Sequence, residues 1–285
     1  MIPVTAWARK VKQPRGGYLP VKSMRAERFD DGRVMNPVEN LNPGTVGTAV
    51  DYISRVMAGG DVRDVFRLPI AGAEKLGRKV MADRYVSEIM IFADGLEPGD
   101  DLRDLITAGL NLSRFDVAFK ASDARYLGAL NGEVAIDDAT MENMQTMLRR
   151  IAAFRDRNGL LDARPRYMRY KTFPGLTGED CLSGEADIVS GSSLWDCKAM
   201  TAKLRATYTA QLLAYYVMLF HEQGLDAVAC VRSGRFNPFS DGPGDFTLGF
   251  FNPRENTEYR TTASGIPSDT FAAFESALVD IAYMY

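Results

Sequence analysis

The chain of 285 residues has few cysteines and almost no histidine: three cysteines, Cys181, Cys197 and Cys230, and a single histidine, His221. No two cysteines form a Cys-x-x-Cys pair, which argues against a zinc site or an iron–sulfur cluster held by this chain alone. His221 follows the apolar run YYVMLF near an expected helix end, where the helix dipole favours a histidine. We therefore assign His221 no catalytic role.

The chain also lacks an apolar run long enough to span a bilayer, and its first residues, MIPVTAWARKVKQPRGG, lack the apolar segment of a secretory signal. We therefore expect a cytoplasmic protein with no membrane partner. Hydrophobic residues make up 46% of the chain, which is enough to build a core. The net charge of −3 is not that of a protein that coats nucleic acid non-specifically, although a local basic groove is compatible with it.

Prolines and glycines interrupt residues 1–43, so we expect an irregular N-terminal segment there. We expect residues 44–285 to form one domain, and its first part, residues 44–137, to be mostly helical. The clearest expected helices of this part are 46–57, which is followed by Gly59-Gly60, and 73–94.

The pattern changes in residues 138–233, where a helix, three strands, a helix and a strand are expected in that order. The predicted elements are a helix at 138–157, strands at 166–173, 179–189 and 193–199, a helix at 201–223 and a strand at 226–232. Residues 234–285 add a strand at 245–251 and a helix at 268–284. The short connections predict an α/β fold with a central mixed sheet flanked by helices.

Two neighbouring strands, LSGEADIV and SLWDCKA, carry charged residues at alternate positions. A turn centred on Gly191-Ser192 places Asp187 opposite Asp196 and Glu185 opposite Lys198, all on one face. The other face of the hairpin is then apolar and is formed by Ala186, Ile188, Trp195 and Cys197. The first face therefore gathers three carboxylates and an ammonium group.

A solvated outer face with surface salt bridges is the simplest explanation of such a hairpin. Directly opposed aspartates would be destabilising, however, because like charges would lie about 4.5–5.5 Å apart, and acidic residues are depleted in strands. A divalent cation between Asp187 and Asp196 removes this repulsion, and hard oxygen ligands suit Mg²⁺ or Mn²⁺. Lys198, on the same face, is placed to hold an attacking water or to stabilise charge at a phosphorus atom.

Three short motifs follow one another in this region: Gly184-x-x-Asp187, Asp196-x-Lys198 and Gln211-x-x-x-Tyr215. Their order and spacing resemble the RecB-like branch of the PD-(D/E)xK nuclease superfamily, which shows GxxD, then (D/E)xK, then QxxxY on the next helix. The resemblance implies a restriction-endonuclease-like αβββαβ core. It also implies that the helix face carrying Gln211 and Tyr215 lies beside the metal site.

A fourth run, Gly47 to Asp51, is similar to the first-helix motif of that branch, in which a histidine follows a G-T-x-V sequence. The position of that histidine is Asp51 here. An aspartate can bind metal, so Asp51 is a candidate ligand, and an exposed helix residue is the alternative. Glu142, on the helix before the first strand, competes for the same acidic role.

Basic residues around residue 160 are the best candidates for a surface that tracks phosphates, although a solvated helix face is the stronger explanation for any one of them. These residues are Arg149, Arg150, Arg155, Arg157, Arg164, Arg166, Arg169 and Lys171.

The resemblance implies a Mg²⁺- or Mn²⁺-dependent deoxyribonuclease that hydrolyses phosphodiester bonds in DNA. It favours an exonuclease-like mode in DNA repair, recombination or phage biology. The expected metal ligands are Asp187, Asp196 and Asp51, and the expected catalytic set is Asp187, Asp196, Lys198, Gln211, Glu185 and Tyr215. Two alternatives stay open: a catalytically inactive nuclease-fold module that binds nucleic acid or a protein partner, and an enzyme that acts on RNA.

Overall fold

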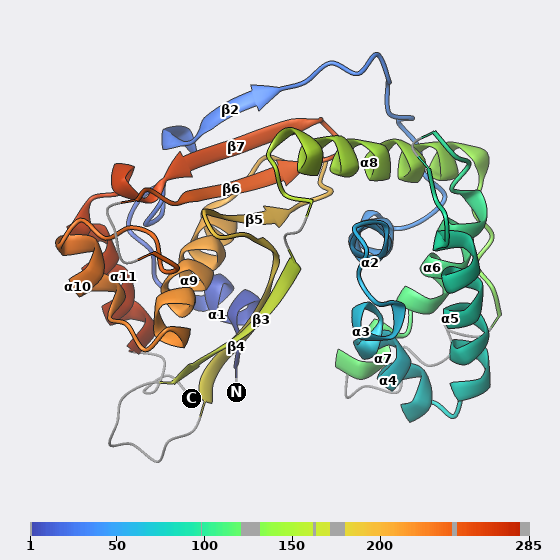
Figure 1. The fold of residues 1–285 in the computed structure, drawn as a ribbon, viewed down its shortest axis with the longest axis horizontal. Coiled ribbons are helices and arrows are strands. Elements are labelled where there is room, and N and C mark those ends of the chain that lie inside the picture. Colours follow the sequence, from blue (N-terminus) through green and yellow to red (C-terminus); the bar gives the residue numbers. More distant parts are fainter. Residues whose placement is uncertain are drawn as a thin grey trace.

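A computed structural model describes residues 2–97, 99–120, 132–161, 164–171, 180–240 and 244–279. These residues form an α/β lobe built on a sheet and a helical lobe, and helix α8 (Asp138–Arg157) runs between the two (Figure 1). None of the described helices is both long and apolar enough to cross a membrane.

The sheet is mixed and open, with seven strands among the described residues. Its strands are β1 (Ile2–Pro3), β2 (Arg25–Arg28), β3 (Arg164–Lys171), β4 (Asp180–Val189), β5 (Ser193–Cys197), β6 (Thr247–Asn252) and β7 (Thr257–Thr262). They lie in the order β1-β4-β5-β6-β7-β2, and β3 pairs with β4 outside this path. The pairs β1–β4 and β5–β6 are parallel, and the others are antiparallel.

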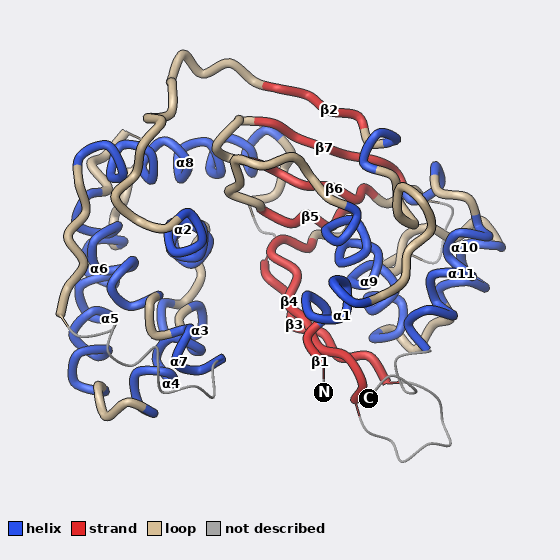
Figure 2. The backbone as a smooth tube through the Cα atoms, turned by 180° about the vertical axis from the view of Figure 1, so that it is seen from behind, coloured by secondary structure: helices blue, strands red, loops and turns tan. Residues whose placement is uncertain are grey.

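Helices cover both faces of the sheet (Figures 1 and 2). In the α/β lobe these are α1 (Val4–Lys10), α9 (Ala206–Glu222), α10 (Ala227–Arg232) and α11 (Ser268–Val279). The helical lobe contains α2 (Pro43–Met57), α3 (Val62–Val65), α4 (Arg67–Lys75), α5 (Lys79–Ala93), α6 (Arg103–Ser113) and α7 (Asp116–Lys120). Short 3-10 turns occupy Val21–Ser23 and Ala263–Gly265.

Neighbouring residues of the central strands point into two different cores, as the alternation of side chains along a strand requires. Leu194 and Phe250 pack with α1 and α9, whereas Trp195 and Phe251 pack with the helical lobe. The ring of Phe154 on α8 stacks on Phe251 with 4.3 Å between centroids and meets Trp195 edge-on at 5.0 Å. The sheet therefore joins the two lobes through its own side chains.

Along one edge of β4, the middle residues have no partner strand, which leaves an opening in the sheet. This edge pairs with β1 only at residues 182–183 and with β5 only at residues 188–189, whereas β3 pairs with the opposite edge. Residues 184–187, which carry the G-E-A-D motif, therefore make no ladder pair with β1 or β5. These residues separate β1 from β5, the two strands that pair with this edge of β4.

A β-bulge lies beside this opening. Arg164 pairs with Val189 and Arg166 with Ala186, so two residues of β4 face the single residue Pro165. Proline has no N–H to donate to a ladder and is found in sheets at edges and bulges. The bulge changes the alternation of β4, so that Ala186 packs in one core and Ile188 in the other. The expectation that Ala186 shares an apolar face with Ile188 is therefore wrong.

Several predicted elements are confirmed with small changes at their ends. The helix at 46–57 lies within α2, the helix at 138–157 is α8, and the strand at 245–251 is β6, which begins at Thr247. The helix expected at 201–223 begins only at Ala206. The helix expected at 73–94 is divided, because the chain turns at Gly77, with φ 68°, between α4 and α5. Residues 172–173, 179 and 280–284 lie outside the described part of the chain.

Two predictions are wrong. Residues 226–232 form helix α10 rather than a strand, because Asp226 caps the helix by accepting a hydrogen bond from the Ala229 N–H at 2.8 Å. The strand that follows α9 in the sheet is β6, parallel to β5. The segment 1–43 is not irregular throughout: α1 packs against α9, and β2 pairs with β7, a strand that the sequence did not predict.

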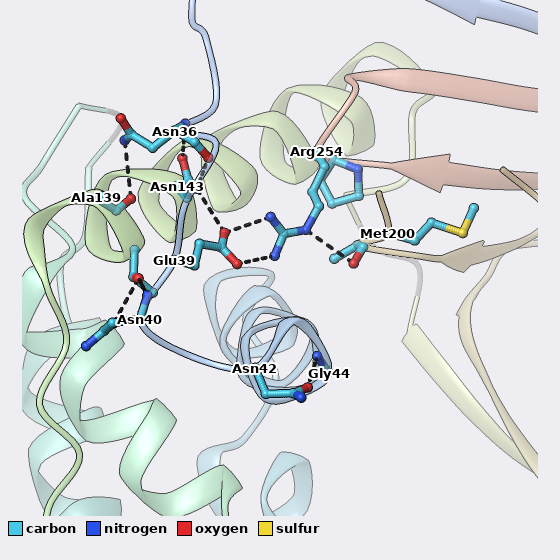
Figure 3. A network of polar contacts seen from close by, with 12 residues as sticks. Asn36, Glu39, Asn40, Asn42, Gly44, Ala139, Asn143, Met200 and Arg254 are labelled. Carbon is cyan, nitrogen blue, oxygen red and sulfur yellow. Dashed lines mark hydrogen bonds and ion pairs between the residues drawn. The ribbon is translucent and has the colours of Figure 1, made fainter. Parts of the chain in front are cut away.

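Residues 29–42, which we call the strap, tie the chain beyond β5 to the helical lobe (Figure 3). Arg254 makes two charge-assisted hydrogen bonds to Glu39, at 2.7 and 2.8 Å, and donates to the carbonyl of Ala199 at 3.4 Å. Glu39 also accepts a hydrogen bond from Asn143 of α8 at 2.9 Å. The side chains of Glu39 and Arg254 are both buried, so this pair fixes the backbone next to Lys198.

Candidate functional site

The opening in β4 places Asp187 where a backbone group would otherwise complete the sheet. Its Oδ2 atom accepts a hydrogen bond from the Cys197 N–H at 2.8 Å. The predicted register is confirmed at Ile188↔Trp195 and Val189↔Leu194. The expected ladder pairs of Asp187 with Asp196 and of Glu185 with Lys198 do not form, because β5 leaves β4 after Trp195 and the side chain of Asp187 bridges the gap.

Asp196 and Lys198 form a close ion pair beside Asp187. Lys198 Nζ lies 2.9 Å from Oδ1 and 2.7 Å from Oδ2 of Asp196, whose side chain is only 1% exposed. Burial raises the pKa of Asp196 to about 7: the charge of Lys198 opposes this shift, and the charge of Asp187 adds to it. Burial lowers the pKa of Lys198, but Asp196 and Asp187 outweigh it, so the net shift is upward and the ammonium stays charged.

Helix α9 brings Gln211 and Tyr215 to the same place. Gln211 Nε2 donates a hydrogen bond to the Tyr215 hydroxyl at 3.0 Å, and both side chains are buried. Burial raises the pKa of Tyr215, and the negative charges of Asp196 and Asp187 add to this effect. The Tyr215 hydroxyl therefore keeps its proton beside the two carboxylates.

Gly184 is required by this arrangement because the ring of Tyr215 lies against its backbone. A Cβ atom at Gly184 would lie 2.4 Å from Tyr215 Cε1 and 3.1 Å from a methyl group of Val4. Contacts under 3.0 Å are not tolerated without movement of the neighbouring atoms. The glycine of the first motif and the tyrosine of the third are thus two sides of one packing contact.

Arg55 of α2 is the residue that the sequence did not single out. Its guanidinium contacts Asp51 at 2.8 Å, Asp187 Oδ1 at 3.2 Å and, very closely, Glu185. Asp51 and Arg55 are four residues apart and therefore share one face of the helix. The acid–base pair four residues apart, which begins at the end of the Gly47 to Asp51 run, is the sequence feature that could have identified Arg55. Burial raises the pKa of Asp51 to about 6 despite the nearby charge of Arg55.

A cleft of about 420 Å³ lies between the helical lobe and strands β3 and β4, beside Arg55 and Glu185. Its basic lining residues are Arg55, Arg67, Arg155 and Arg164, and its acidic ones are Asp61, Asp64 and Glu185. Arg155 is 5% exposed; burial lowers its pKa, and the positive charges of Arg164 and Arg55 add to this effect. The cleft therefore has one more arginine than carboxylates in its lining, next to the ion pairs of the site.

Of the eight basic residues expected to track phosphates, Arg155 and Arg164 line this cleft. Three others hold partners elsewhere: Arg150 pairs with Asp31, Arg157 with Glu258 and Arg166 with Glu222. Arg149 donates to the Asp100 carbonyl, and the guanidinium of Arg169 lies over the ring of Tyr167. The side chain of Lys171 lies outside the described residues.

The remaining candidates lie apart from the ion pairs. Glu142 accepts a hydrogen bond from Asn36 of the strap at 3.0 Å. His221, in the last turn of α9, packs against Tyr170 with 4.9 Å between ring centroids. Cys197 and Cys230 are free thiols, and the side chain of Cys181 is outside the described residues. Cys197 reaches the site through its N–H, which donates to Asp187 Oδ2, whereas the contacts of Glu142 and His221 involve neither Asp187 nor Asp196.

The donor set of this site fits a hard divalent cation that takes few protein ligands. Asp196 Oδ2 is buried and makes no hydrogen bond of good geometry, although Lys198 Nζ lies near it. No group of three or more His, Cys, Asp or Glu side chains within the described ranges is arranged to hold a metal ion. Mg²⁺ is commonly bound through one or two carboxylates, with waters and substrate phosphate completing its shell. Asp187 and Asp196 meet that requirement.

Comparison with models of known protein families, with curated proteins and with solved structures finds no match for this chain. The function proposed below therefore rests on the geometry of the site.

Gly184→Ala is expected to destabilise the protein by about 1–3 kcal/mol, because the added methyl group overlaps the Tyr215 ring in a packed core. Gly191→Ala is the matched control, since a Cβ atom there meets nothing within 4 Å. Urea unfolding of both variants measures the difference. Equal stability of the two variants would contradict the packing contact.

Asp196→Asn is expected to change how stability depends on pH in the presence of EDTA. A carboxyl whose pKa rises from 3.8 to about 7 on folding binds its proton more tightly in the folded state. Its contribution to stability is then lost as the pH increases between these two values. The free energy of unfolding of Asp196→Asn, relative to wild type, should therefore rise on the order of 2–4 kcal/mol from pH 4 to pH 7.5.

The control for this pH series is Asp156→Asn, at an exposed position on α8, which should run parallel to wild type. Urea unfolding at several pH values gives the three curves. A curve for Asp196→Asn that also runs parallel to wild type would show that ionisation of Asp196 does not destabilise the folded protein.

Proposed function

We propose that the chain is a Mg²⁺- or Mn²⁺-dependent nuclease that hydrolyses phosphodiester bonds in DNA. The observation that carries the proposal is the convergence of Asp187, Asp196 and Lys198 at the opening of the sheet, next to an arginine-lined cleft. Asp196 is buried and Asp187 is partly buried, and adjacent carboxylates so placed destabilise a fold unless a proton or a cation neutralises them. A site that only stabilised the fold would gain nothing from this pair.

The order of the elements supports the same proposal. Along the chain the elements come in the order α8, β3, β4, β5, α9, α10 and β6, which is the αβββαβ order of the restriction-endonuclease-like core with helix α10 added before the last strand. The hairpin β4–β5 is antiparallel, and α9 precedes β6, which lies parallel to β5. In the proposed assignment the three motifs of the RecB-like branch occupy β4, β5 and α9.

Each side chain has a separate role in the proposed reaction. Asp187 and Asp196 would hold the divalent cation, which when bound supplies charge neutralisation at the scissile phosphate and a more acidic water. Lys198 stays protonated beside Asp196, so it can orient the attacking water by hydrogen bonding or stabilise charge on the phosphoryl oxygens. Tyr215, held by Gln211, presents a protonated hydroxyl to the same region.

The substrate would approach along the arginine-lined cleft. Arg155 and Arg164 offer positive charge to a phosphodiester backbone, and exposed Tyr167 offers a ring on which a base can stack. A second cleft, of about 530 Å³, shares Arg164 and Pro165 with the first and continues toward Gly191. This continuity suits a chain of phosphates. We further propose that the enzyme acts in an exonuclease-like mode. Its proposed role is in DNA repair, recombination or phage biology, and its proposed location is the cytoplasm.

A nuclease-fold module that binds nucleic acid or a protein partner without cutting is the second candidate. The observation that favours it is Arg55, which holds Asp51, Glu185 and Asp187 in ion pairs. The cleft meets the site at Glu185 and Arg55, whereas Asp196 is fully enclosed. Hydrolysis of RNA is a variant of the first candidate, because phosphate contacts alone do not distinguish the sugars.

The proposal predicts cleavage of labelled linear or single-stranded DNA with Mg²⁺ or Mn²⁺, and none with EDTA. Lys198→Ala and Asp196→Asn should each lower the rate at least about 100-fold, because each removes charge stabilisation that the reaction requires. Lys203→Ala, at an exposed lysine nearby, is the matched control and should keep the wild-type rate. Intact closed circular DNA beside degraded linear DNA would establish the exonuclease mode.

Cleavage that survives Lys198→Ala and Asp196→Asn would contradict the assignment of the site. Absence of cleavage of DNA and RNA by wild type, together with binding to labelled strands, would support the binding module instead.

A further inference from the structure

Arg55 stands between two groups of carboxylates that lie on different elements. Its Nε and Nη2 atoms hold the two oxygens of Asp51 at 3.1 and 2.8 Å, from within α2. Its Nη1 atom contacts Glu185, and its Nη2 atom lies 3.2 Å from Asp187 Oδ1, both on β4. The Arg55 side chain is 10% exposed, so these are enclosed contacts rather than surface pairs.

The charges of the site are unequal. Asp51, Glu185, Asp187 and Asp196 contribute four carboxylates, and Arg55 and Lys198 contribute two cations in direct contact with them. Two negative charges are therefore left over, which is the charge that one divalent cation neutralises.

The position of the surplus decides where a cation would bind. Asp51 and Glu185 are both engaged by the guanidinium, and Asp187 Oδ1 is engaged by the same group. Asp196 Oδ2 is buried and makes no hydrogen bond of good geometry, although Lys198 Nζ lies 2.7 Å from it. A cation at the Asp187–Asp196 pair would share Asp196 with the Lys198 ammonium, whereas one at Asp51 and Glu185 would have to displace the Arg55 guanidinium that contacts both.

We propose that Arg55 is a resident cation that closes the Asp51–Glu185 half of the acidic site, so that the protein binds one divalent cation, at Asp187 and Asp196, and not two. This inference rests on the proposed function, because it assumes that the site binds a metal ion. Arg55 also lines the cleft, so its guanidinium faces any phosphate that enters from there. Asp51 is then a partner of Arg55 and not a metal ligand.

Counting bound Mn²⁺ tests the inference without an activity assay. Mn²⁺ is titrated into the full chain, and the free ion is measured by electron paramagnetic resonance. Wild type is expected to bind one ion per chain, and Asp196→Asn none. Arg55→Met keeps the aliphatic volume but removes the charge, and it should bind two ions because Asp51 and Glu185 become available. Arg55→Met/Asp51→Asn should return to one.

Two variants control for other effects of the substitution. Arg67→Met removes a positive charge from the exposed opposite side of the cleft and should still bind one ion. Circular dichroism checks that each variant is folded. If Arg55→Met does not fold, Arg55→Gln removes the charge but keeps a hydrogen-bonding side chain, and it should also bind two ions because Asp51 and Glu185 both remain.

The outcomes separate this inference from the proposed function. One ion in wild type and one in folded Arg55→Met would overturn the inference and leave the nuclease proposal standing. Two ions in wild type would do the same. If neither wild type nor Arg55→Met binds an ion, both the inference and the nuclease proposal are overturned. Ions bound by Arg55→Met but not by wild type would show that Arg55 blocks the entire site, which contradicts a single-ion site in the native protein.

Discussion

The structure depends on a pair of carboxylates, Asp187 and Asp196, held close together inside the protein at the point where the sheet opens. Burial of like charges costs free energy unless another charge compensates for it, and here Lys198 and Arg55 each compensate for part of it. Neighbouring features adapt to this pair. Pro165 produces the bulge that displaces Asp187, and the Asp187 side chain takes the Cys197 N–H that β4 no longer satisfies. The fold therefore accepts a local cost at the place where the proposed chemistry occurs.

The two lobes contribute different parts of this site. The sheet supplies the carboxylates on β4 and β5, Lys198 directly follows β5, and α9 supplies Tyr215 against Gly184. The helical lobe supplies Arg55, and with it one wall of the arginine-lined cleft. The shared aromatic packing of Phe154, Trp195 and Phe251 holds the lobes together. The strap adds a second connection, through the buried pair of Glu39 and Arg254, which fixes the backbone just beyond Lys198. Relative movement of the lobes would therefore alter the distance between Arg55 and the carboxylates.

Local sequence pattern predicted what depends on neighbours in the chain. The long helix α8 and the part of the hairpin register next to the turn follow from periodicity and turn residues, and the structure has them where expected. The expected pairs farther from the turn, Asp187 with Asp196 and Glu185 with Lys198, do not form. Contacts between distant segments were not predictable in this way. β2 is a short charged strand whose partner β7 lies over 200 residues away, and Arg55 meets Glu185 across 130 residues. The error at residues 226–232 has a different cause: a short apolar run fits a helix or a strand, and the cap at Asp226 decides between them.

Anomalous diffraction from crystals grown with Mn²⁺ tests the metal site most directly. One strong peak is expected about 2.1 Å from an oxygen of Asp187 and from an oxygen of Asp196, with Arg55 still against Asp51 and Glu185. A peak between Asp51 and Glu185 with Arg55 displaced would contradict the role given to that arginine. Well-ordered carboxylates with no peak between Asp187 and Asp196, at saturating Mn²⁺, would contradict the metal site itself.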